Sequence, residues 1–190
     1  MAFPSLSHLD WALLHALQGI PSASWHAAMA WLSRPGHAWV WGVVFLAAWI
    51  RSRRWAAWLE LPALVLLIGV TDRLGVTLKT LFGRVRPCHL DDTVRGILGC
   101  GGRYSFPSNH ALNTAALAGF AFALWPRAGM ILAGLSLLVG ISRVDMGVHY
   151  PSDVLAGWVI GGALGYFWGR WVGQRSRRRL PTRSSTEDTP

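Results

Sequence analysis

Three short segments of this sequence contain side chains that could bind an anion and transfer protons. The segments are KTLFGRVRP (79–87), PSNH (107–110) and SRVDMGVHYPSD (142–153). Together they supply several cations, two histidines, a serine and a carboxylate. Cations attract anions, and a histidine oriented by a carboxylate can act as a nucleophile or a proton carrier. The fold must bring the three segments together if they are to act as one site.

Two prolines predict helices that begin beside these side chains. Pro107 suits the first position of a helix, where a missing N–H costs nothing. The free N–H groups of Ser108 and Asn109 would then point at an anion above the helix. Pro151 opens a second helix in the same way. It places Asp153 in the first turn, where the helix dipole favours a carboxylate.

Lys79 and Arg86 are seven residues apart, about two helical turns, so they could share one helix face. Pro87 weakens that geometry, because it favours an extended conformation for the residue before it. Taken singly, an interfacial cation can simply extend to lipid head groups, and a serine or aspartate can be only a helix cap. The group as a whole favours an anion site. A metal site formed by two histidines and an aspartate is the weaker alternative, because the cations, including Arg143, would repel a divalent metal.

The composition predicts a membrane protein. Of 190 residues, 52% are hydrophobic and 14% are charged, and the mean hydropathy is positive. A soluble domain has about a quarter of its residues charged. The 12 tryptophans suit a bilayer, where indole rings lie at the interface. The net charge is +9, but the cations do not form one face, so no nucleic-acid partner is expected.

Charge-poor runs predict an all-α fold, a polytopic transmembrane helical bundle of about five spans. The runs are His37–Ile50, Leu61–Thr71, Tyr104–Pro126, Ala128–Ser142 and Val154–Gly169. A span needs about 20 mainly apolar residues, so several runs must include flanking residues. Leu9–Leu32 is broken by Gly19-Ile20-Pro21, which favours two short interfacial helices over a sixth span. The predicted parts are an N-terminal segment (1–34), a transmembrane catalytic domain (35–173) and a basic, then disordered, cytoplasmic tail (174–190).

Basic residues in the loops predict the orientation of the bundle in the membrane. Arg51–Arg54, Arg127 and Arg175–Arg179 place their loops and the C-terminus in the cytoplasm. The remaining cations then face outward, against the usual rule, and are expected to have another function. They are Lys79, Arg84, Arg86, Arg95, Arg103 and Arg143.

Several residues have no single interpretation from the sequence. Arg84, Arg95 and Arg103 could assist the anion site or be solvated. Asp72 could pair with Lys79, and Asp145 could be only a loop residue. Glycines at every fourth position of the last run would let another helix approach closely, and packing alone is their preferred interpretation. They are Gly157, Gly161, Gly165 and Gly169.

The three segments, in this order and with these gaps, resemble the signature motifs of the type 2 phosphatidic acid phosphatase (PAP2) family. The resemblance covers roughly residues 55–170. It implies that His149 attacks phosphorus, that Asp153 holds the other ring nitrogen, and that His110 protonates the leaving oxygen. It also implies a set of phosphate-binding residues and a reaction that needs no metal or cofactor. The implied phosphate-binding residues are Lys79, Arg86, Ser108, Asn109 and Arg143, of which Asn109 departs from the glycine most common in the family.

The resemblance also suggests a substrate and a location. Small bacterial members often act on undecaprenyl diphosphate, which predicts a multi-pass inner-membrane enzyme with its active site facing the periplasm or exterior. Phosphatidylglycerol phosphate, phosphatidic acid and lipid A phosphate remain alternatives. So do a lipid phosphotransferase, a halide oxidase of the vanadium haloperoxidase type and an inactive lipid-binding protein. The sequence leaves the oligomeric state open.

Cys88 and Cys100 are the only cysteines, and both lie in the loop predicted to face outward. An extracytoplasmic loop is in an oxidising compartment, which favours a disulfide between them. Two unpaired thiols are the alternative, because the sequence alone does not fix their separation.

Overall fold

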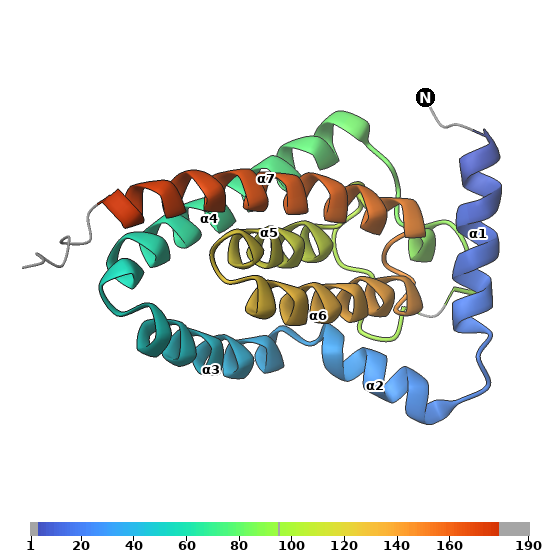
Figure 1. Ribbon diagram of the computed structural model, residues 1–190. Coiled ribbons are helices and arrows are strands. Elements are labelled where there is room, and N and C mark those ends of the chain that lie inside the picture. Colours follow the sequence, from blue (N-terminus) through green and yellow to red (C-terminus); the bar gives the residue numbers. More distant parts are fainter. Residues whose placement is uncertain (1–3, 95, 179–190) are drawn as a thin grey trace, which may run out of the picture.

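The computed structural model describes residues 4–94 and 96–178, and over these residues the chain is helical without any β-strand (Figure 1). The predicted all-α class is confirmed. Two single 3-10 turns, η1 (Arg54–Ala56) and η2 (Pro87–His89), accompany the α-helices. The α-helices are α1 (Pro4–Gln18), α2 (Ala23–Ser33), α3 (Pro35–Arg53), α4 (Ala57–Phe82), α5 (Asn109–Leu124), α6 (Pro126–Asp145) and α7 (Pro151–Arg178).

Helix α5 lies at the centre of the bundle, against α4, α6 and α7, and its contact with α7 is the most extensive between any two of the described helices. The glycine stripe of α7 makes this approach possible. A Cβ atom on Gly157 would lie 2.8 Å from the carbonyl oxygen of Ser108, and one on Gly169 would lie 2.8 Å from that of Phe120. The two backbones therefore touch directly, which confirms the packing interpretation of the stripe.

The outer surface of the bundle is apolar, as the membrane prediction requires. Val65 of α4, Ile131 of α6 and Phe167 of α7 are 73%, 68% and 71% exposed. The stretch Phe45–Phe82, which runs from α3 into α4, and helix α6 are each long and apolar enough to cross a bilayer. The number of spans and the orientation stay predictions.

The N-terminal segment consists of two helices, interrupted where Gly19-Ile20-Pro21 predicted a break. Helix α2 is fixed to the end of α6 by Asp145, which is buried rather than a simple loop residue. The Asp145 carboxylate lies 3.0 Å from Nδ1 of His26 and accepts a hydrogen bond from Nε1 of Trp25 at 3.1 Å. A membrane-interfacial position for these two helices stays a prediction.

A buried ion pair joins α3 to α4 at the far end of the bundle. Glu60 is fully buried, and its carboxylate accepts hydrogen bonds from Nη2 of Arg53 at 2.6 Å and Nε1 of Trp49 at 3.0 Å. A buried carboxylate needs such partners, because desolvation of an unpaired charge costs several kcal/mol. The pair fixes the turn around η1.

Three helices have ends that the charge-poor runs did not specify. Helix α4 extends beyond Leu61–Thr71 on both sides and ends at Phe82; Gly83 follows it with a φ of 58°, the left-handed conformation common after a helix. Helix α5 begins at Asn109, so the predicted run Tyr104–Pro126 starts as a loop, and Pro107 precedes the N-cap Ser108 rather than occupying the first helical position. Helix α7 includes the basic residues up to Arg178, and the predicted disordered end (180–190) lies outside the described residues.

The direct contact between α5 and α7 predicts opposite effects for two adjacent glycines. Gly161→Ala should lower the melting temperature in detergent, because the added methyl would overlap the backbone of Leu112 at a cost of about 1–3 kcal/mol. Gly162→Ala, with no neighbouring atom within 4 Å of the new Cβ, is the matched control and should be neutral or stabilising. Equal melting temperatures for the two variants would contradict the packing described above.

Candidate active site

The three segments singled out in the sequence meet at one end of the bundle. Lys79 lies in the last turn of α4, His110 in the first turn of α5, and Arg143 in the last turn of α6. His149 follows in the short loop before α7, and Asp153 lies in the first turn of α7, as its position after Pro151 predicted. The electrostatic interactions of His110 extend to Arg143, His149, Arg86 and Lys79, so the fold gathers all of these groups.

His149 is buried, and its ring faces the carboxylate of Asp153. Its Nδ1 lies 3.6 Å from Oδ2 of Asp153, an ion-pair distance slightly longer than a hydrogen bond. The same oxygen accepts a hydrogen bond from the backbone N–H of Tyr150 at 2.9 Å, which fixes the carboxylate. Burial lowers the pKa of His149 to about 4, although Asp153 acts in the opposite direction. The imidazole is therefore neutral at neutral pH, and Nε2 carries a lone pair.

The start of α5 is tied to the start of α7. The backbone N–H of Ser108 donates to the carbonyl oxygen of Asp153 at 3.0 Å. The expectation that this N–H is free for an anion is therefore wrong. The Ser108 side chain is buried and caps α5 by accepting from the N–H of Ala111 at 3.5 Å. His110, the second residue of α5, is exposed beside this junction.

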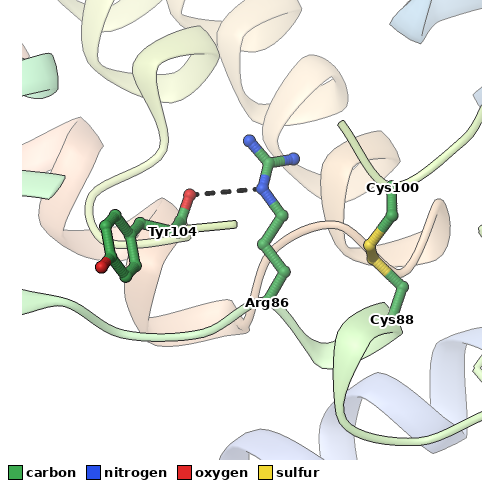
Figure 2. The surroundings of a disulfide bond; sticks show 4 residues. All are labelled: Arg86, Cys88, Cys100 and Tyr104. Atoms are coloured by element: carbon green, nitrogen blue, oxygen red, sulfur yellow. Dashed lines mark hydrogen bonds between the residues drawn. A yellow bond between two sulfur atoms is a disulfide. The ribbon is translucent and has the colours of Figure 1, made fainter. Parts of the chain in front are cut away.

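Lys79 and Arg86 do not share a helix face, because α4 ends before Arg86. Both instead hold the loop that leads into α5. Nζ of Lys79 donates to the carbonyl oxygens of Ser105, at 3.0 Å, and Pro107. Nε of Arg86 donates to the carbonyl oxygen of Tyr104 at 3.2 Å (Figure 2). The two cations are thus brought together by the loop and not by a shared helix face, and Arg86 has the extended conformation that Pro87 favours.

A disulfide closes this loop. Cys88 and Cys100 are bonded, with their Cα atoms 6.0 Å apart, a normal separation for a disulfide. Figure 2 shows the bridge close to Arg86. The backbone N–H of Cys88 also donates to the carbonyl oxygen of Gly147 at 3.2 Å, which joins the loop to the segment that carries His149.

The cations of the site differ in whether a carboxylate neutralises them. Within the described part of the chain, Lys79, Arg86 and Arg143 form no salt bridge, and the buried Nε of Arg143 has no hydrogen-bond partner. Arg84, by contrast, binds two carboxylates, those of Asp10 at 2.6 Å and Asp153 at 2.7 Å. All three uncompensated cations interact electrostatically with His110, and Lys79 and Arg86 also act on His149, so this end of the bundle attracts an anion.

Two side chains, Arg84 and Asp10, show where sequence reasoning was incomplete. Arg84, left open in the sequence, is a structural partner of Asp153. Asp10 was missed, although it is the only acidic residue before Glu60 and a lone carboxylate in an apolar helix requires a partner when buried. Arg103 is exposed, and Arg95 lies outside the described residues. Among those residues no three His, Cys, Asp or Glu side chains are grouped as metal ligands would be.

Asn109 connects α5 to α4. Its Nδ2 donates to the carboxylate of Asp72 at 3.0 Å, and Nδ2 of Asn113 donates to the same oxygen at 3.3 Å. Asp72 therefore bonds to these two amides, not to Lys79. Gly75 leaves the room that Asn109 occupies, since a Cβ there would lie 2.9 Å from Cγ of Asn109. The departure from the common glycine at 109 is thus matched by a glycine across the helix interface.

A model of the PAP2 superfamily matches residues 60–177, more than half of the chain. The chain belongs to this superfamily. The match includes every residue proposed for the site from the sequence.

Relatives within the superfamily have different names. A lipid A 1-phosphatase of Rhizobium etli is 38% identical over 47% of this chain. An undecaprenyl-diphosphatase of Sulfolobus acidocaldarius is 30% identical over 65% of the chain. A lipid A 4'-phosphatase of Bacteroides thetaiotaomicron is 28% identical over 97% of the chain. The matches span 40%, 66% and 84% of these relatives. The crystal structure of a transmembrane PAP2-type phosphatidylglycerolphosphate phosphatase from Bacillus subtilis superposes with a TM-score of 0.69, over 95% of this chain and 90% of the other, at 26% identity.

The pairing of Gly75 with Asn109 predicts a compensating double substitution. Gly75→Ala should lower the melting temperature, because the methyl displaces the Asn109 amide from Asp72, at a cost of about 1–3 kcal/mol. Adding Asn109→Gly to Gly75→Ala should return the melting temperature toward that of the parent. Gly69→Ala in the same helix, with open space around the new Cβ, is the control and should not destabilise. Failure of Asn109→Gly to rescue Gly75→Ala would show that the two positions are independent.

Proposed function

We propose that this PAP2 protein is a membrane phosphatase that removes phosphate from a lipid phosphate or diphosphate through a phosphohistidine at His149. One observation carries the proposal. Lys79, Arg86 and Arg143 lack carboxylate partners within the described residues and lie within electrostatic range of His110. Such a group attracts an anion and can stabilise charge on a transferring phosphoryl group.

In the first half of the reaction, Nε2 of His149 attacks phosphorus while the bond from phosphorus to the leaving oxygen breaks. His110, protonated beside the bound phosphate, donates its proton to that oxygen. Asp153 faces the other ring nitrogen of His149 and stabilises the positive charge that develops on the ring. The three cations balance the charge on the equatorial phosphoryl oxygens.

In the second half, a water molecule attacks the phosphohistidine. The neutral His110 accepts a proton from this water as the P–N bond breaks, which releases phosphate and restores both histidines. Ser108 places His110 in this scheme, because its N–H is engaged by Asp153. The N–H of Asn109, at the first position of α5, has no acceptor within the helix and is assigned to the phosphate. The cations supply the charge stabilisation that a metal provides elsewhere, so we propose that no metal is required.

The apolar surroundings of the site support a lipid substrate. A groove of about 390 Å³ lies between α1, α6 and α7, beside the start of α7, and includes Leu13, Val144 and Trp158 in its lining. It suits an apolar chain. A second cavity, of about 440 Å³, lies near Trp55 and Trp58 and contains none of the proposed site residues.

The preferred substrate is undecaprenyl diphosphate, hydrolysed to undecaprenyl phosphate. Residues 4–94 and 96–178 form one helical bundle without a separate unit that could grasp a large head group, which favours a substrate that is little more than phosphate on a long apolar chain. One of the relatives above is named as an undecaprenyl-diphosphatase. Lipid A phosphate, phosphatidylglycerol phosphate and phosphatidic acid are the alternatives, and transfer of the phosphoryl group to a lipid acceptor is another. We place the site at the outer face of a bacterial inner membrane and the C-terminus in the cytoplasm.

His149→Ala and His110→Ala should each abolish turnover by purified protein while leaving the melting temperature within a few degrees of the parent. The two residues are assigned as nucleophile and acid in a reaction whose barrier an enzyme must lower greatly. The parent should keep its activity in EDTA and lose it in vanadate, which mimics the transferring phosphoryl group. Loss of activity in EDTA, restored by a divalent metal, would overturn the metal-free scheme.

The substrate assignment predicts the highest kcat/KM for undecaprenyl diphosphate. We would measure kcat/KM on one detergent preparation for this lipid, phosphatidylglycerol phosphate, phosphatidic acid and lipid A phosphate. The same assays with an added lipid acceptor separate hydrolysis from transfer. A kcat/KM at least 10-fold higher for a glycerophospholipid or for lipid A phosphate would reject the assignment and leave the phosphatase proposal intact.

A further inference from the structure

We infer that Asp10, on the N-terminal helix α1, is a positioning residue of the active site that acts on His149 through Arg84 and Asp153. The inference rests on the proposed function. Asp10 lies far outside residues 60–177, which match the superfamily model, so the assignment comes from this structure alone. Figure 1 shows α1 lying across the end of the bundle where α7 begins.

Asp10 caps α7 from another helix. The carboxylate is 3% exposed, and its Oδ1 accepts the backbone N–H of Ser152 at 2.9 Å. Its Oδ2 accepts the Ser152 hydroxyl at 2.6 Å. The first N–H groups of a helix have no partner within the helix, so a carboxylate supplied from α1 both satisfies and orients this end. The turn that carries Asp153 is thereby held in place.

Asp10 also shares Arg84 with Asp153. One guanidinium nitrogen, Nη2, donates to Oδ2 of Asp10 at 2.6 Å, and the other, Nη1, donates to Oδ1 of Asp153 at 2.7 Å. Because Arg84 occupies Oδ1 of Asp153, Oδ2 is the oxygen that faces Nδ1 of His149. The arginine thus selects which oxygen of the catalytic carboxylate serves the nucleophile.

The charges of this chain of contacts explain why a second carboxylate is needed. Burial lowers the pKa of Arg84, but Asp153 and Asp10 together raise it above its ordinary value, so the group stays a cation. An arginine paired with Asp153 alone would neutralise that carboxylate and weaken its support for a positive His149 ring. Asp10 supplies a second negative charge, which leaves the trio with a net charge of −1.

Aromatic packing fixes the same arrangement from the side. The guanidinium carbon of Arg84 lies 3.9 Å from the centre of the Tyr150 ring. Trp11, the neighbour of Asp10 on α1, packs edge-on against that ring at 5.3 Å. Tyr150 is therefore held between α1 and Arg84, which limits movement of the adjacent His149.

The test compares Asp10→Asn with Glu60→Gln in the full-length protein in detergent. Glu60 is a matched control, because it is also a buried carboxylate that accepts hydrogen bonds from an arginine and a second residue, here Arg53 and Trp49. It lies at the opposite end of the bundle. Asp10→Asn should reduce kcat by about 10- to 100-fold, as removal of an outer partner of a catalytic group does elsewhere, with KM nearly unchanged. Glu60→Gln should lose as much melting temperature but keep kcat within about 2-fold of the parent.

Ligand binding gives a readout that does not depend on the choice of substrate. Vanadate binding depends on His149, whereas inorganic phosphate is held by the cations. Asp10→Asn should therefore weaken vanadate about 10-fold and phosphate less than 2-fold, and Glu60→Gln should change neither. Arg84→Gln should weaken vanadate binding by the same factor. Adding Asp10→Asn to Arg84→Gln should weaken vanadate binding little further, because Asp10 acts through Arg84.

The outcomes separate this inference from the function on which it rests. Vanadate binding and kcat at parental levels in Asp10→Asn would overturn the role of Asp10 and leave the phosphatase proposal standing. Equal kcat losses in Asp10→Asn and Glu60→Gln would overturn it as well, because they would reflect stability alone. A parent protein that neither binds vanadate nor hydrolyses any lipid phosphate would reject the proposed function itself, and the positioning role with it.

Discussion

The direct contact between the backbones of α5 and α7 is the constraint on which the rest of the structure depends. Glycines on α7 remove the side chains that would keep the helices apart, and the Ser108 N–H closes the contact by donating to the carbonyl of Asp153. The starts of both helices are therefore fixed at the same level. Because His110 lies in the first turn of one helix and Asp153 in the first turn of the other, the two histidines share one site.

The cations near the site fall into two groups, those paired with a carboxylate and those that are not. Arg84 is neutralised by two carboxylates and belongs to the support of the site. Among the described residues, Lys79 and Arg86 donate hydrogen bonds only to carbonyl oxygens, so their charges remain available to an anion. Carbonyl contacts orient a cation without cancelling it, whereas a carboxylate at 2.6 Å largely does. The difference between an anion-binding residue and a structural residue is thus set by the partner, not by the residue type.

Both N-terminal helices are fixed to the loop region around His149 through buried carboxylates. Asp10 reaches from α1 to Ser152 and Arg84, and Asp145 at the end of α6 receives Trp25 and His26 from α2. These contacts lie at the two ends of the loop between α6 and α7. In an apolar bundle, a buried carboxylate is satisfied in few geometries, so each one fixes a specific docking of its helix.

The sequence by itself determined the helical membrane class, the break between α1 and α2, the start of α7 at Pro151, and the three segments that meet at one end of the bundle. These depend on local chemistry: apolar run length, proline at a helix start, and motif spacing. It did not predict the end of α4 at Phe82, the cap at Ser108 or the occupied N–H of that residue, because loop paths depend on distant partners. Only the tertiary structure decided that Arg84 supports Asp153 and that Asp10 completes the pair. No local pattern connects Asp10 to a carboxylate 143 residues later in the chain, since their contact exists only when α1 lies across the start of α7.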